Sequence, residues 1–88
     1  MSRLINRPVQ MTSRPSALAR TPEPVSWVHA GARYRVVEVL ETWEEAGRWW
    51  EQEAPATAWR VRVQHGGVME LVMLHKQPPE WRLMRSYD

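Results

Sequence analysis

Arginine and tryptophan are the residues of this sequence that are best suited to recognising another molecule. The chain has eleven arginines and one lysine, together with six tryptophans and no phenylalanine or cysteine. A guanidinium group binds phosphate or carboxylate in a planar, bidentate manner, and an indole ring stacks on a nucleic-acid base or fills a pocket of a protein partner. The composition therefore points to recognition, and the spacing of these residues indicates where it takes place.

The arginines alternate with apolar residues along segments that favour strands. Alternation with period two places neighbouring arginines on one face of a strand and the apolar residues on the other. One alternative is a solvated sheet face held by cross-strand ion pairs, and another is a general compositional bias toward arginine. The arginines that we predict to contact a partner or nucleic acid are Arg33, Arg35, Arg60, Arg62 and Arg82.

The adjacent tryptophans Trp49 and Trp50 are the second candidate contact. Neighbouring side chains of an extended chain point to opposite sides, so one of these two rings is expected to be exposed. Arg48 precedes them directly and glutamates surround them. An exposed indole in this setting suits either base stacking or a protein contact. In contrast, the sequence places Trp27, Trp59 and Trp81 on strands, where we expect them to form the core.

Catalytic and metal-binding chemistry is poorly represented in this chain. The absence of cysteine excludes thiolate zinc sites, iron–sulfur clusters and cysteine nucleophiles. The three histidines, His29, His65 and His75, are not at metal-ligand spacing, and there is no glycine-rich phosphate loop or GxSxG motif. We therefore expect no catalytic activity, no metal and no cofactor.

The net charge of +2 hides three blocks of different sign. Residues 1–22 carry +4, residues 23–58 carry −4, and residues 59–88 carry +2. A dedicated nucleic-acid binder is usually more basic in total, but a local basic face is compatible with this distribution. No apolar run approaches the ~20 residues of a membrane span, and no apolar signal core is present near the N-terminus. We accordingly expect a cytoplasmic protein without a membrane-bound part.

Two regions of different composition divide the chain. Residues 1–24 are rich in proline and arginine, which predicts a mobile N-terminal arm with at most one edge strand over residues 9–13. Residues 25–88 alternate in the manner of short strands separated by glycine and proline turns. The expected fold is mainly β, a small single-domain antiparallel sheet or an SH3-like or OB-like barrel of five to six short strands. Residues 44–50 are ambiguous between a loop and a short helix.

The turn at residues 65–67 sets the register of one predicted hairpin. A loop of His65, Gly66 and Gly67 places Trp59 opposite Met73 and Arg62 opposite Glu70, with apolar side chains facing one another. A two-residue loop would mix arginines into the apolar row. We therefore predict the three-residue loop, with a glycine in the positive-φ position.

Four segments resemble a small bacterial domain. The segments are RYRVVEVLETW at residues 33–43, GRWW at 47–50, WRVRV at 59–63 and WRLMRSYD at 81–88. Together they are similar to the C-terminal domain of ImuB-type proteins, which are Y-family polymerase homologues. The resemblance implies a bacterial cytoplasmic context and a connection with DNA-damage tolerance, and it supplies no catalytic residues.

Two functions of different class follow from these observations. The first is a non-catalytic interaction module that docks on a polymerase or another protein of a DNA repair assembly through Trp49 and Trp50. The second is direct nucleic-acid binding through the strand arginines and the arginines of the N-terminal arm, with salt-sensitive affinity. A third reading is a homodimer formed through an exposed β edge.

Overall fold

The computed structural model describes residues 2–16, 21–45 and 55–87, and in this part of the chain all regular structure is β. The prediction of a mainly β protein is confirmed, although the number of strands exceeds the expected five to six. No helix of the described segments is long and apolar enough to cross a membrane. The strands are β1 (Ser2–Pro8), β2 (Gln10–Arg14), β3 (Glu23–His29), β4 (Ala32–Glu45), β5 (Ala56–Val63), β6 (Val68–Leu74) and β7 (Glu80–Tyr87).

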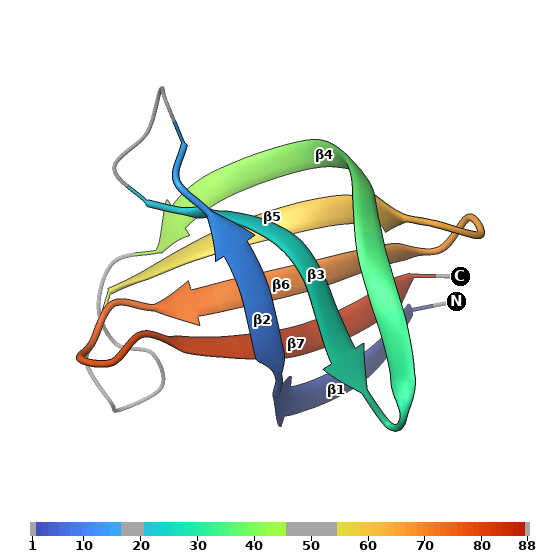
Figure 1. The fold of residues 1–88 in the computed structure, drawn as a ribbon, viewed down its shortest axis with the longest axis horizontal. Coiled ribbons are helices and arrows are strands. Elements are labelled where there is room, and N and C mark those ends of the chain that lie inside the picture. Colours follow the sequence, from blue (N-terminus) through green and yellow to red (C-terminus); the bar gives the residue numbers. More distant parts are fainter. Residues whose placement is uncertain (1, 17–20, 46–54, 88) are drawn as a thin grey trace.

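The strands form one antiparallel sheet in the order β1-β7-β6-β5-β4-β3-β2. Strands β2 to β7 follow one another as a meander, whereas β1 joins the opposite edge by pairing with β7. Only Val9 separates β1 from β2, so the two edges of the sheet must lie close together. The Val9 amide donates to the carbonyl oxygen of Trp81 at 3.0 Å. The sheet is therefore curled, with β2 and β3 crossing over its concave side (Figure 1).

The N-terminal region differs from the expected mobile arm. Residues 2–8 form β1 and residues 10–14 form β2, where at most one edge strand was predicted. The strand predicted over residues 9–13 corresponds to β2 and pairs with β3. Strand β1 contains a bulge, and its partner β7 lies at the other end of the chain, so local sequence does not predict the pairing of these two strands.

The long strand β4 connects the two halves of the curled sheet. Its first residues pair with β3 up to Arg35, and its later residues pair with β5 from Val36 onward. Register shifts between Val36 and Glu38, and between Val39 and Glu41, each add one residue to β4. Such bulges bend a strand and increase its twist, which lets one strand serve both halves.

The concave side of the sheet contains the main core. Trp27, Trp59 and Trp81 are buried there, which confirms the prediction for these three tryptophans. The Trp59 and Trp81 rings stack with centroids 5.1 Å apart, and Trp27 stacks on Tyr34 at 5.5 Å. Aliphatic side chains of β5, β6 and β7 complete this cluster. A second apolar cluster, formed by Ala56, Ala58, Val72, Leu74 and Met84 with Trp43, lies apart from the first because these strand residues alternate with the core residues.

The β5–β6 hairpin has a three-residue loop, displaced by one residue from the predicted position. The Val63 amide donates to the Gly67 carbonyl at 2.8 Å, so the loop consists of residues 64–66. His65 and Gly66 both have positive φ, where a glycine alone was expected. Consequently Arg60, rather than Arg62, lies opposite Glu70. The register differs by two residues, which leaves the predicted faces of both strands unchanged.

Candidate functional site

The predicted arginines of the sheet face are paired with glutamates. Arg60 forms an ion pair with Glu41, and Arg62 forms one with Glu38. Glu38 and Glu41 are three residues apart, so they would point to opposite faces of a regular strand. The extra residue between Val39 and Glu41 lets both glutamates lie beside the β5 arginines. This surface is therefore a solvated sheet face held by cross-strand ion pairs, one of the alternatives that the sequence left open. Arg62 pairs with Glu38, whereas the predicted hairpin register placed it opposite Glu70.

Arg60 is further held between two aromatic rings. Its guanidinium carbon lies 5.9 Å from the Trp43 ring centroid and 5.2 Å from that of Tyr87, within the range of cation–π contacts. The Tyr87 hydroxyl in turn donates to Glu70 at 2.6 Å. Burial and this hydrogen bond raise the pKa of Tyr87 above its ordinary value. A phosphate approaching Arg60 would have to displace several of these contacts.

The Arg82 guanidinium group also has partners within the protein. It donates to Glu80 at 2.6 Å, and this hydrogen bond, together with one from Lys76, lowers the pKa of the Glu80 carboxyl. Its other nitrogens donate to Asn6 of β1, at 2.9 Å to Oδ1 and 3.1 Å to the backbone carbonyl. Arg82 thus fixes the bulge of β1 rather than facing an outside ligand.

The remaining predicted contacts are not brought together by the fold. Arg33 donates to the Ser26 hydroxyl at 3.4 Å, while the exposed Arg35 forms no ion pair with any described residue. Both lie on the β4 segment that pairs with β3. The predicted contacts Arg48, Trp49 and Trp50 lie outside the described residues.

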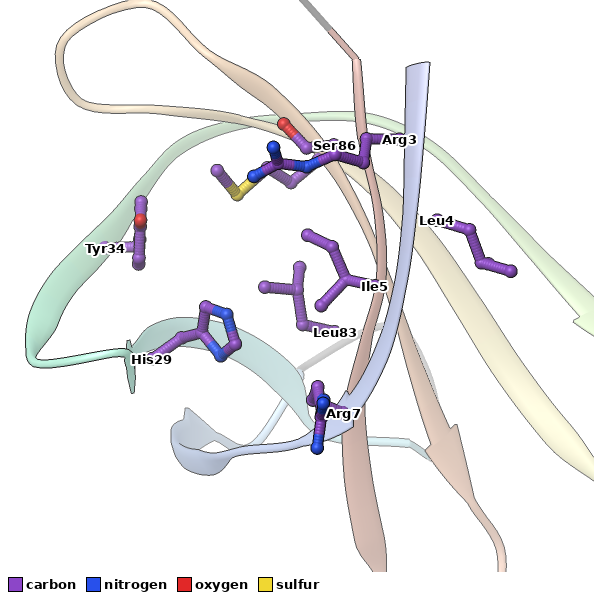
Figure 2. Close-up of a pocket in the computed structure, with 9 residues that line it drawn as sticks. Arg3, Leu4, Ile5, Arg7, His29, Tyr34, Leu83 and Ser86 are labelled. Atoms are coloured by element: carbon purple, nitrogen blue, oxygen red, sulfur yellow. The ribbon is translucent and has the colours of Figure 1, made fainter.

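A cavity of about 330 Å³ lies between β1 and β7 on one side and the β3–β4 hairpin on the other (Figure 2). Its walls combine basic, aromatic and apolar side chains. Figure 2 shows Ile5 and Leu83 in its middle, with His29 and Tyr34 facing them, whereas the side chain of Leu4 extends from the other side of β1. The residues that line it are Arg3, Leu4, Ile5, Arg7, His29, Tyr34, Met69, Leu83 and Ser86.

Bulges in β1 and β7 determine which side chains reach this cavity. In β1 the register shifts between Leu4 and Arg7, and Asn6 adopts a φ of 50° within the shift. In β7 the register shifts after Leu83, so Leu83 and Ser86 both line the cavity although their spacing is odd. The two bulges therefore place apolar side chains, Ile5 and Leu83, and polar side chains, Arg3, Arg7 and Ser86, around one cavity.

Two arginines without carboxylate partners among the described residues line this cavity together. Arg3 and Arg7 both line it, and neither forms an ion pair with any described residue. None of its lining residues is an aspartate or glutamate. His29 adds an imidazole ring, whose nitrogens can form hydrogen bonds with a ligand. Uncompensated positive charge beside an apolar floor favours an anionic ligand with an apolar portion.

The sequence pattern predicts the arginines of the N-terminal arm as nucleic-acid contacts only as a group, and it does not single out Arg3, Arg7, His29 or Tyr34 as site residues. The alternation of Arg3, Ile5 and Arg7 at every second residue was the available local signal. The contribution of β3 and β4 to the same cavity depends on the curl of the sheet and is not visible in the sequence.

Two other features are less suited to ligand binding. An open groove of about 710 Å³ near Trp81 is lined by prolines, and the charges at its edge, Lys76 and Glu80, are paired at 3.0 Å. Thr57 forms hydrogen bonds with Glu44 and His75, but it is almost completely buried and so is inaccessible to a substrate. Within the described segments no cluster of His, Cys, Asp or Glu could hold a metal ion.

Comparison with known proteins yields one match. A family model described as Domain of unknown function (DUF6504) matches residues 1–88. No curated protein and no solved structure matches the chain.

Proposed function

The chain belongs to the family described as Domain of unknown function (DUF6504), and we propose that it is a non-catalytic domain that binds nucleic acid, with Arg3 and Arg7 as its phosphate contacts. The observation that carries this proposal is the distribution of ion pairs. Arg60, Arg62 and Arg82 are neutralised by glutamates, whereas Arg3 and Arg7 face a cavity without acidic lining. Free arginines bind phosphate without first losing an intramolecular partner.

The biological setting of the proposal comes from the sequence resemblance to the ImuB C-terminal domain. That resemblance implies that the nucleic acid is DNA and that the protein is an accessory in bacterial DNA-damage tolerance. Docking on a polymerase or repair protein through Trp49 and Trp50 stays a prediction, because these residues lie outside the described segments.

Substituting Arg3 and Arg7 together by alanine is expected to weaken binding of a fluorescein-labelled single-stranded oligonucleotide and to flatten its salt dependence. Each phosphate contact contributes about 0.7 to the slope of log affinity against log salt for single strands. Loss of two contacts should therefore reduce the slope by about 1.4. Fluorescence anisotropy over a series of salt concentrations measures both quantities.

A double substitution of Arg14 and Arg62 by alanine is the matched control. It removes the same charge from residues that are paired with Glu23 and Glu38 at the surface. The control should bind with nearly the wild-type slope. If both double variants lose the same slope, binding follows total charge rather than the cavity, and the proposal fails. It also fails if the wild-type protein binds no oligonucleotide at low salt.

A second candidate function, self-association, is favoured by the free edge of β4. Val37, Val39 and Leu40 are exposed by 56%, 42% and 38%, and no described strand pairs with this edge beyond Arg35. An unpaired edge with apolar side chains is a template for another strand. Two antiparallel copies centred on Glu38 would place Val37 of each against Val39 of the other, as an isologous contact requires.

The substitution Val37→Lys is expected to convert such a dimer to a monomer, because it places a charge in the centre of the shared edge. Light scattering on a size-exclusion column measures the mass over a range of concentrations. Val28→Lys is the matched control, since Val28 is similarly exposed at 40% but lies on β3 between two partner strands. A wild-type protein that stays monomeric at all concentrations would exclude this candidate.

A further inference from the structure

We infer that the cavity accepts one unstacked base of a single-stranded nucleic acid, with the base against Tyr34 and phosphates at Arg3 and Arg7. This inference rests on the proposed function and extends it from phosphate binding to the recognition of single strands. It is carried by the size of the cavity, by its apolar floor and by the position of the two arginines.

The size of the cavity limits the ligand to one small unit. Its volume of about 330 Å³ is near the lower end of the ~300–1,000 Å³ usual for ligand pockets. The cavity therefore suits a single ring system and does not suit a duplex. In a duplex the bases are paired and stacked inside the helix, whereas a single strand can place a base in a protein pocket.

The interior of the cavity suits the flat, largely apolar face of a base. Ile5, Met69 and Leu83 supply aliphatic surface. Tyr34 lines one wall, and its ring stacks on the buried ring of Trp27 with an interplanar angle of 18°. Because Trp27 supports it, Tyr34 is held in place before a ligand arrives, which reduces the entropic cost of stacking.

The polar groups of the cavity are arranged around this apolar interior. Arg3 and Arg7 are four residues apart on β1, about 13 Å for a regular strand and somewhat less with the bulge. They can therefore contact phosphates on either side of one nucleotide. His29 and Ser86 add a ring nitrogen and a hydroxyl that can form hydrogen bonds with the edge of a base.

An abasic oligonucleotide separates the base contact from the phosphate contacts. We compare an oligothymidine with an abasic strand that has the same number of phosphates, by anisotropy at fixed salt. The wild-type protein is expected to bind the oligothymidine about tenfold more tightly, in keeping with the loss on removing one stacked base. Equal affinities for the two strands would overturn the inference.

The variant Tyr34→Ala should abolish this difference, whereas Tyr34→Phe should keep it because the ring remains. Tyr87→Ala is the matched control, since Tyr87 lies against Arg60 and does not line the cavity. Circular dichroism checks that each variant is folded. If Tyr34→Ala is unfolded, amide shifts in the wild-type protein on titration with thymidine monophosphate provide the second measurement. Shifts confined to the lining residues support the inference, and shifts absent from them oppose it.

The outcomes distinguish the two levels of the proposal. Suppose that both strands bind with equal, salt-sensitive affinity and that this binding is lost when Arg3 and Arg7 are substituted. This result retains the proposed function and refutes the base pocket. No binding of either strand refutes both.

Discussion

Replacing Trp59 by alanine is expected to lower the free energy of unfolding by about 3–5 kcal/mol. The Trp59 side chain is only 4% exposed, and its ring stacks on Trp81 in the middle of the core. A domain of this kind is stabilised by about 5–15 kcal/mol in total. The variant should therefore be marginally folded, and urea unfolding followed by circular dichroism measures the loss.

The variant Trp59→Phe separates the loss of volume from the loss of the aromatic pair. Phenylalanine retains a ring against Trp81 and leaves a smaller cavity, so the destabilisation should be clearly smaller than for alanine. A loss within about 0.5 kcal/mol for Trp59→Ala would show that this ring is not part of the core.

The substitution Leu83→Ala is expected to destabilise the protein by about 2–5 kcal/mol. Leu83 is 1% exposed, lies opposite the fully buried Leu71, and also forms part of the cavity floor. Removing it leaves a void at the junction of β1, β6 and β7. Urea unfolding again measures the effect, and the midpoint should fall without a change in the slope if the folded state is otherwise unaltered.

Leu4→Ala is the matched control for this prediction. Leu4 is on the neighbouring strand β1, but its side chain is 65% exposed and extends from the side of β1 opposite to Ile5 (Figure 2). The same truncation should therefore change the free energy of unfolding by no more than about 0.5 kcal/mol. Similar losses for the two leucine variants would contradict the assignment of Leu83 to the core.

The strands of the C-terminal half were predictable because their signal is local. Trp59, Val61 and Val63 alternate with arginines, and this period of two alone indicates a strand with one buried face. The positions of Trp27 and Trp81 on predicted strands also indicated that they would be core residues. Even where the hairpin loop was misplaced, the faces were correct, because the error was an even number of residues.

Ion-pair partners and strand pairings between residues distant in sequence could not be predicted from this local alternation. Arg62 pairs with Glu38 rather than Glu70 because the β5–β6 register differs and because β4 contains two bulges. A bulge adds one residue to a strand without a reliable sequence signal, and every pairing beyond it is displaced. The order of strands at the sheet edges is equally hidden, since β1 pairs with the last strand of the chain.

The sequence by itself determined that the protein is a small β domain and which side chains of the C-terminal strands alternate between the core and the surface. Only the tertiary structure decided which of the described arginines form ion pairs. Pairing of the bulged strand β4 with β5 neutralises Arg60 and Arg62 with glutamates, and closure of the curled sheet brings Arg3 and Arg7 to the cavity beside Tyr34. The physical reason is that alternation depends on neighbouring residues, whereas charge pairing and cavities depend on contacts between strands far apart in the chain.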